Sequence, residues 1–195
     1  MSANGIKDAG QKHLLLATID EQARPLSIRV LGAYAESLGV RTTLLVILKK
    51  LATHGQPVTF SDREVSQLAG FLEREHVTHL GFYLMTASLA PCTLLVAALR
   101  KAGYRGVILT GGVHAWLRPE ESLVDGADFA IQGPGELPLA RILDGATELS
   151  AIPGLAWRSG GTIRVNPVSP EQALDLDALP FPIFASDHHA GALDL

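Results

Sequence analysis

Short apolar runs alternate along the chain with stretches in which apolar residues recur at helical spacing. The apolar runs predict buried strands at residues 13–19, 41–49, 78–85, 106–110 and 127–132. The stretches between them predict helices at residues 25–39, 61–76, 91–103, 119–123 and 136–145. Because the strands are apolar at consecutive positions, they are typical of a parallel sheet covered on both faces. The predicted fold class is therefore α/β, with a Rossmann-like or flavodoxin-like doubly wound sheet of five parallel strands.

Residue types that begin and end helices support these boundaries. Pro25 and Pro91 stand where helices are expected to begin, because the fixed φ of proline suits the first helical turn. Ser61 and Glu64 have the spacing of a capping box, in which each side chain binds the backbone N–H of the other residue. Gly39 stands where the first helix is expected to end, as glycine often does.

The pattern changes after residue 145. Two β-like runs around a Ser-Gly-Gly sequence, within residues 154–167, predict a hairpin. The segment after it is rich in proline and aperiodic, which favours a linker or a covering strap over a second core. We therefore expect an N-terminal tail at 1–12, a Rossmann-like domain at 13–148, the β-hairpin at 149–168, and a linker or strap at 169–195.

Composition narrows the class of protein. The 195 residues are 47% hydrophobic and 18% charged, which suits one substantial core. We see no membrane-spanning run and no signal-peptide pattern, so we expect a cytoplasmic protein with no membrane partner. The net charge is −4 and the basic residues are scattered, which disfavours nucleic acid as a partner. The single cysteine, Cys92, excludes a disulfide, a CxxC zinc site or an iron-sulfur cluster held within this chain.

The candidate site lies where the predicted strands end. Ligands of open parallel sheets bind at the carboxyl ends of the strands, which here continue into loops at 20–25, 84–91, 110–116 and 132–136. Two of these loops carry glycine pairs, which permit positive φ and close backbone approach by a large planar or nucleotide-like ligand. Ordinary tight turns before helices are the alternative explanation of the glycines.

Several other functions lack their sequence motifs. No GxGxxG follows the first strand, and no GxxxxGK[ST] or GxSxG occurs, which disfavours NAD, nucleoside triphosphates and serine hydrolysis. The third strand ends without the aspartate that a receiver domain needs. We expect His76, His79, His188 and His189 on the solvated surface, whereas His114 lies in a ligand-edge loop with either a structural or a chemical role.

Taken together, these segments resemble the cobalamin (vitamin B12)-binding domain found at the N-terminus of cobalamin-dependent radical S-adenosylmethionine (radical SAM) enzymes. The resemblance covers about residues 14–184. It rests on PLSIRVLGAYAESLG (25–39), LGFYLMTAS (80–88), LTGGVHAWLRPEESL (109–123) and GADFAIQGPGE (126–136), and on the later IPGLAWRSGG and DLDALPFP.

The resemblance implies that cobalamin is the cofactor, with its displaced nucleotide tail between the glycine pairs. It implies no catalytic residue and no metal ligand in this chain. The implied cofactor-binding residues are Asp20, Glu21, Gln22, Arg24, Pro25, Tyr83, Leu84, Met85, Thr86, Ser88, Gly111, Gly112, Val113, His114, Gly133, Pro134, Gly135 and Glu136.

The chain departs from the family in ways that affect the site. The B12 domains of mutases and methionine synthase carry Asp-x-His-x-x-Gly after the first strand, and the histidine ligates cobalt. Here the loop is DEQARP, and Gln22 or Arg24 holds the histidine position. The resemblance therefore implies base-off cobalamin without a histidine lower ligand, which favours methyl transfer. Tyr83 replaces a serine near the nucleotide base, and Pro134 replaces the family's first glutamate.

The CxxxCxxC motif of a radical SAM domain does not occur in this sequence. The chain alone is therefore not expected to cleave S-adenosylmethionine. The resemblance implies a radical SAM domain in cis or in trans, which would hold the iron-sulfur cluster and S-adenosylmethionine and act as a methyltransferase or cyclase. The alternatives are a stand-alone cobalamin carrier and a Rossmann-like domain that binds another nucleotide-like ligand or none.

Overall fold

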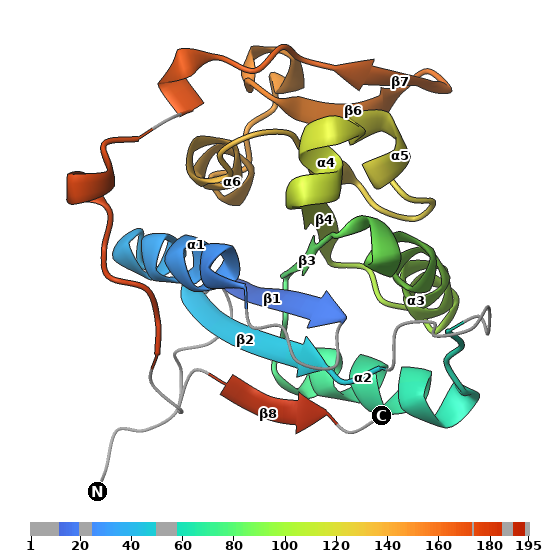
Figure 1. Cartoon of the computed structure of the whole chain (residues 1–195). Helices are drawn as coiled ribbons and strands as arrows, with labels where there is room; N and C mark the ends of the chain where they lie inside the picture. Colours follow the sequence, from blue (N-terminus) through green and yellow to red (C-terminus); the bar gives the residue numbers. More distant parts are fainter. Residues whose placement is uncertain (1–11, 20–24, 50–57, 173, 185–188, 194–195) are drawn as a thin grey trace, which may run out of the picture.

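A computed structural model describes residues 12–19, 25–49, 58–172 and 174–184 of the protein. For residues 189–193 it describes the backbone alone. Its strands form one sheet in the order β7-β6-β5-β4-β3-β1-β2-β8 (Figure 1). The strands are β1 (His13–Ile19), β2 (Arg41–Ile47), β3 (His79–Tyr83), β4 (Val107–Gly111), β5 (Phe129–Ile131), β6 (Leu155–Ser159), β7 (Thr162–Val165) and β8 (His189–Leu193).

The central part of the sheet is the predicted parallel sheet. Strands β5, β4, β3, β1 and β2 are neighbours in this order, and every pairing among them is parallel. Buried β1 runs through the middle of the sheet, and all seven of its residues are buried. The predicted α/β fold is confirmed.

Helices cover both faces of the sheet, as the continuous apolar pattern of the strands indicates. Leu14 and Leu16 of β1 pack with α1 and α6, whereas Leu15, Ala17 and Ile19 pack with α2 and α3. Alternate residues of one strand therefore belong to two separate cores. The helices are α1 (Leu26–Ser37), α2 (Asp62–Arg74), α3 (Leu89–Lys101), α4 (Val113–Leu117), α5 (Pro119–Ser122) and α6 (Glu136–Leu143).

The predicted capping box at the start of α2 is present. The Glu64 backbone N–H donates to Ser61 Oγ at 3.3 Å, and the Ser61 backbone N–H donates to the Glu64 carboxylate at 2.6 Å. Lys49, just after β2, forms an ion pair with the same carboxylate. These contacts lower the pKa of Glu64 although burial opposes them. The Lys49–Glu64 ion pair therefore connects the start of α2 to the segment that follows β2.

The structure shows three features that the sequence pattern did not reveal. The hairpin β6–β7 is continuous with the sheet, because β6 pairs antiparallel with β5. Strand β8, within the predicted linker or strap, pairs parallel with β2 at the opposite edge. Helix α4 directly follows β4, where only a loop was expected. The sheet therefore extends beyond the five predicted parallel strands at both edges.

The expectation that His79 lies on the solvated surface is wrong, whereas His76 is exposed as expected. His79 is 8% exposed, at the start of β3, where its Nδ1 lies 2.9 Å from Thr78 Oγ1. It is buried because strands of a covered sheet bury their side chains on both faces. The side chains of His188 and His189 lie outside the described residues.

His13, at the start of β1, is also buried. Its Nδ1 lies 2.7 Å from the Glu75 carbonyl oxygen, and its Nε2 lies 2.8 Å from Thr43 Oγ1. A neutral ring satisfies both contacts, with Nδ1–H donating to the carbonyl and Nε2 accepting from the hydroxyl. Burial lowers the pKa of both His13 and His79 below the ordinary value of 6.5.

These pKa shifts predict acid sensitivity. As the pH falls below about 6.5, the unfolded chain binds protons at these two histidines that the folded chain does not bind, so the free energy of unfolding decreases. Thermal unfolding measured from pH 8 to pH 5 should show a stable plateau above this value and a decline below it. The decline should be shallower for His13→Gln and unchanged for His76→Gln, whose side chain is exposed. Identical profiles for these two variants would contradict this assignment.

Candidate cofactor site

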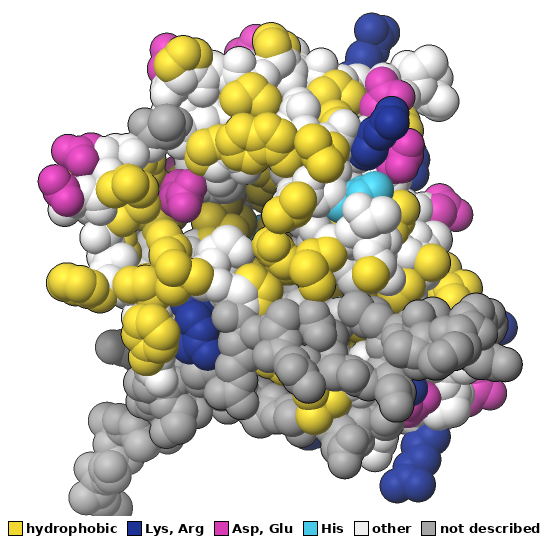
Figure 2. Space-filling model, in the orientation of Figure 1, with side chains coloured by type: hydrophobic (Ala, Val, Ile, Leu, Met, Phe, Trp, Pro, Cys, Tyr) yellow, Lys and Arg dark blue, Asp and Glu magenta, His cyan; other side chains and the backbone are white. Residues whose placement is uncertain are grey.

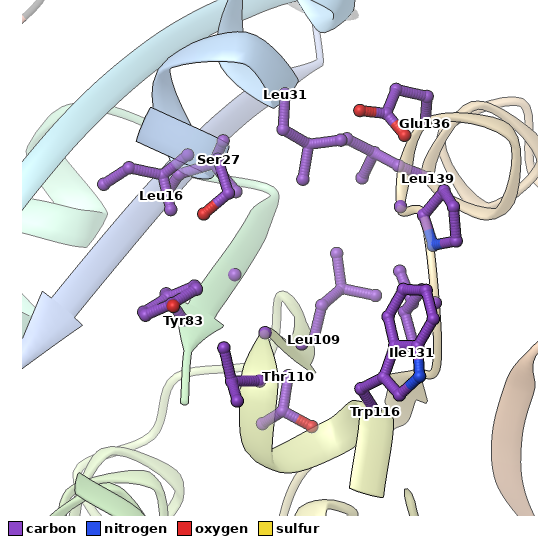
Figure 3. A pocket seen from close by; sticks show the side chains of 18 of the residues that line it. Leu16, Ser27, Leu31, Tyr83, Leu109, Thr110, Trp116, Ile131, Glu136 and Leu139 are labelled. Carbon is purple, nitrogen blue, oxygen red and sulfur yellow. The ribbon is translucent and has the colours of Figure 1, made fainter. Parts of the chain in front are cut away.

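A cavity of about 710 Å³ opens between α1 and α6 over one face of the sheet (Figure 3). Its floor consists of residues from four neighbouring strands: Leu16 of β1, Gly81 and Tyr83 of β3, Leu109 and Gly111 of β4, and Ile131 of β5. Ser27, Ile28 and Leu31 of α1 form one side, and Glu136 and Leu139 of α6 form the other. The cavity therefore lies toward the carboxyl ends of the central strands, where the sequence placed the site.

Strand register explains why these residues share one face. Gly81 of β3 pairs with both Leu16 of β1 and Leu109 of β4. Two residues further along, Tyr83 of β3 pairs with Gly111 of β4. Residues two apart in a strand point to the same face, so both rows face α1 and α6. Gly111 leaves space above the sheet that a larger side chain would fill, whereas a Cβ atom at Gly81 would lie 2.7 Å from Leu16 Cδ2.

The four predicted glycines differ in what requires them. Gly112 has φ +101°, and a Cβ atom there would lie 2.7 Å from Tyr83 Cδ2. Gly133 has φ +87°, and a Cβ atom there would lie 3.3 Å from both Gln172 Nε2 and Val168 Cγ1. Gly111 and Gly135 do not have positive φ, and their added Cβ atoms would meet nothing closer than 3.8 Å and 3.4 Å, respectively. Turn geometry therefore accounts for Gly112 and Gly133, whereas Gly111 and Gly135 face open or loosely packed space.

Polar side chains are few in the cavity wall. In Figure 3 the hydroxyl groups of Ser27 and Tyr83 lie on the opposite side of the cavity from Ile131 and Leu139. Thr110 also lines the cavity, but its hydroxyl donates to the Ser122 carbonyl oxygen at 2.6 Å. Glu136 adds a carboxylate at the start of α6. The site suits a ligand that is largely apolar with a small number of hydrogen-bonding groups.

The loop after β3 is held together by its own contacts. Ser88 is 1% exposed, and its hydroxyl lies 3.0 Å from both the backbone N and the backbone O of Met85. The Leu84 N–H donates to the Gly111 carbonyl oxygen at 2.7 Å, and the His114 N–H donates to the Leu84 carbonyl oxygen at 3.0 Å. The loops after β3 and β4 therefore form one hydrogen-bonded unit.

His114 joins the same unit through its ring. Its Nδ1 lies 3.1 Å from Thr86 Oγ1, and its Nε2 lies 3.5 Å from a Glu121 carboxylate oxygen. The side chain is buried, and Nε2 has no hydrogen-bond partner among the described residues. In the described part of the chain, His114 therefore holds α4 against the loop after β3 and does not line the cavity.

The predicted site residues fall into three groups, and binding by each stays a prediction. The cavity brings together Tyr83, Gly111, Gly112, Val113, Gly133, Pro134, Gly135 and Glu136. Beside the cavity, but not among the residues that line it, are Pro25, Leu84, Met85, Thr86, Ser88 and His114. Outside the described residues are Asp20, Glu21, Gln22 and Arg24.

Many residues that line the cavity were not predicted from the sequence. The additional lining residues include Ser27 and Leu31 on α1, Gly81 on β3, Trp116 on α4 and Leu139 on α6. Hydrophobic side chains also gather around a hollow on this face of the molecule (Figure 2). Trp116 and Leu117 are exposed on α4, but neither this helix nor their exposure is evident from the sequence, so no local signal marked them as lining residues.

A metal site is not apparent in the described residues, since they contain no group of at least three His, Cys, Asp or Glu side chains that could hold an ion. None of the helices in the described part of the chain is long and apolar enough to cross a membrane.

A doubly wound domain with an apolar cavity at the carboxyl ends of its strands is typical of proteins that bind organic cofactors. The family model of the B12 binding domain matches residues 12–143, which run from the start of β1 to the end of α6. The chain therefore belongs to the B12-binding domain family, whose ligand is cobalamin. A comparison with curated proteins finds no match.

The glycine geometry predicts different effects at adjacent positions. Gly112→Val places a branched residue at φ +101° and ψ −166° and against the Tyr83 ring, and should destabilise the ligand-free protein by about 1–3 kcal/mol. Gly111→Val, in open space at the end of β4, should stay within about 0.5 kcal/mol of the parent. Chemical denaturation of both variants without cobalamin measures the difference. Equal stabilities would show that the backbone at Gly112 tolerates a side chain.

Proposed function

We propose that this chain binds cobalamin base-off, with the nucleotide tail in the cavity between α1 and α6. Family membership supports cobalamin as the ligand, and the cavity supports the position of the tail. A volume of about 710 Å³ is within the usual range of organic-ligand sites. The single observation that carries the proposal is this cavity, with Gly111 at the strand end facing unfilled space.

The fit of the tail follows from the chemistry of the wall. Leu31, Leu109, Ile131 and Leu139 present apolar surface to a flat aromatic base, and Ser27 and Tyr83 offer hydroxyl groups. A base that occupies this cavity is separated from cobalt, so occupancy of the cavity and the base-off state are the same proposal. The corrin ring then lies over the loops at the carboxyl edge.

We propose further that no histidine replaces the displaced base below cobalt. The loop at 20–25 contains no histidine, and the predicted Gln22 or Arg24 position lies outside the described residues. Of the histidines with described side chains, His13 and His79 lie at the starts of β1 and β3, and His76 lies just before β3, all at the opposite end of the strands from the cavity. His114 lies near the proposed edge, but its ring is directed to Thr86 and Glu121.

The residues of this chain hold and orient the cofactor. When bound, cobalamin would supply a cobalt centre that can accept and transfer a methyl group. The apolar wall excludes water from the tail, and the hydrogen-bonded loops after β3 and β4 provide a rigid surface at the edge.

The protein context that we propose is a cobalamin-dependent radical SAM system, in cis or in trans, with methyltransferase or cyclase chemistry. The sequence resemblance at 25–39 and 109–123 supports it. The chain's one cysteine, Cys92, is fully buried in α3, so the iron-sulfur cluster and S-adenosylmethionine belong to another domain or protein. A stand-alone cobalamin carrier would need the same cavity and differs in passing its cofactor to a partner.

Tryptophan fluorescence provides a local test of cobalamin binding. Trp116 lines the cavity. The other tryptophan, Trp157, lies in the hairpin strand β6, opposite Phe129 of β5, and does not line the cavity. Hydroxocobalamin should quench Trp116 in the Trp157→Phe variant with a saturable curve, and more strongly than it quenches Trp157 in the Trp116→Phe variant.

Gly111→Val should weaken cobalamin binding by about tenfold or more, because its side chain enters the tail cavity.

Gel filtration with visible absorbance checks that the quenching reflects a complex. Cobalamin that elutes entirely free of protein would disprove the proposal. Unchanged affinity in Gly111→Val, with parental stability, would place the tail elsewhere.

Electron paramagnetic resonance tests the lower ligand. The Co(II) form bound to the protein should lack nitrogen superhyperfine splitting, since neither the displaced base nor a histidine lies below cobalt. Free cobalamin at neutral pH, with its base coordinated, is the positive control. Nitrogen splitting in the bound form would contradict the proposal, and its loss in His114→Ala would identify His114 as the ligand.

A further inference from the structure

One wall of the cavity comes from outside the region matched by the family model. Residues 169–172 and 174–184 follow the hairpin and pass along α6 toward α1 (Figure 1); from here on, the name strap means these residues alone, without β8. Leu174, Leu176 and Leu179 of the strap line the cavity, although the family match ends at residue 143. The strap is therefore part of the proposed cofactor site and not only a connection.

The first end of the strap is fastened to the loop after β5. Gln172 is fully buried, and its Nε2 donates to the carbonyl oxygens of Gln132 and Pro134 at 3.0 and 3.1 Å. Its Oε1 accepts from the Ser169 N–H at 3.0 Å. A buried amide with both ends bound fixes one orientation. It also holds the Gly133 to Gly135 turn that lines the cavity.

The other end is fastened to α1. Arg29 is 7% exposed, and its Nη1 donates to the Ile183 carbonyl oxygen at 2.6 Å. The Ile183 N–H donates to the Arg29 carbonyl oxygen at 3.2 Å. A buried guanidinium that loses this carbonyl would be left with an unsatisfied charge, so the contact is costly to break. The strap therefore bridges the two sides of the cavity, with its leucines between two fixed points.

The side chains that the strap presents to the cavity are all apolar. The strap contributes three leucines to the cavity lining and no polar side chain, since Asp175 and Asp177 are exposed and outside the lining. The hydroxyl groups of Ser27 and Tyr83 come from α1 and β3. A base that contacts the strap therefore meets only apolar side chains there.

We propose that the strap selects corrinoids by their lower base, favouring the apolar dimethylbenzimidazole of cobalamin over a purine such as adenine. This inference rests on the proposed placement of the tail in the cavity. The two methyl groups of dimethylbenzimidazole gain apolar contact with leucine side chains. The amine and ring nitrogens of adenine lose water at such a wall without gaining partners.

The test compares three corrinoids on the full chain: cobalamin, its analogue with adenine as the lower base, and cobinamide, which lacks the nucleotide tail. The adenine analogue should bind about tenfold more weakly than cobalamin, as expected for a buried polar group left without a partner. Cobinamide should bind more weakly than cobalamin as well, because it leaves the cavity unfilled.

Variants assign the selectivity to the strap. Leu176→Gln places an amide at the cavity rim, and because Leu176 is 81% exposed the fold should not depend on it. Leu179→Gln makes the same change at a second lining position. Each should reduce the preference for cobalamin over the adenine analogue to about threefold or less, by supplying a hydrogen-bond partner to the purine. Leu94→Gln on α3, an exposed leucine outside the cavity lining, is the matched control and should keep the parental preference.

The outcomes separate this inference from the proposed function. Equal affinity of the parent for cobalamin and the adenine analogue, with cobalamin still bound, would overturn base selection and leave cobalamin binding standing. A parental preference in both strap variants would overturn the role of the strap. Failure of the parent to bind any of the three corrinoids would overturn both proposals. Melting temperatures of all variants exclude unfolding as the cause of a change.

Discussion

The register of the parallel strands at the centre of the sheet is the constraint on which the rest of the structure depends. Gly81 pairs with Leu16 on one side and Leu109 on the other, so the cavity floor is a row of strand positions and not a loop. A shift of one residue in β3 would turn Gly81 and Tyr83 to the face covered by α2 and α3. The same register brings the ends of β3 and β4 together, which allows their loops to exchange hydrogen bonds through Leu84, Gly111 and His114. The strand register that pairs β1, β3 and β4 therefore also determines the shape of the site.

Glycine in this site has two separate physical roles. At Gly112 the backbone itself excludes other residues, because of its positive φ and the Tyr83 ring. At Gly111 the backbone permits a side chain, and the space beside it is open. The sequence shows only adjacent glycines and so cannot separate a turn requirement from a space requirement. The structure separates them: positive φ requires glycine at position 112, whereas Gly111 faces open space, which is where we propose that the ligand lies.

Sequence patterns predicted the elements whose signals are local. The consecutive apolar residues of 13–19 indicated a strand buried on both faces, and the Ser61–Glu64 spacing indicated a capping box; both are present. Features that depend on distant partners were not predictable in this way. Burial of His79, attachment of the hairpin to β5, and the strand β8 all depend on which strands become neighbours. Ser27 and Trp116 were missed for the same reason, since nothing in their local sequence indicates that they face one cavity.

The extent of the site differs from the extent of the family match. Residues 12–143 contain the five parallel strands, the four large helices and most of the cavity, yet the part of the wall formed by Leu174, Leu176 and Leu179 lies outside them. Gln172 shows why the two parts are inseparable: its amide binds the carbonyl oxygens of Gln132 and Pro134, within the matched region, from a position outside it. These carbonyls would lose that partner without the strap, and the turn that carries Gly133 and Gly135 would lose its support. The strap therefore supports the shape of a family element as well as lining the cavity, and the corrinoid selectivity that we propose would depend on residues outside the matched domain.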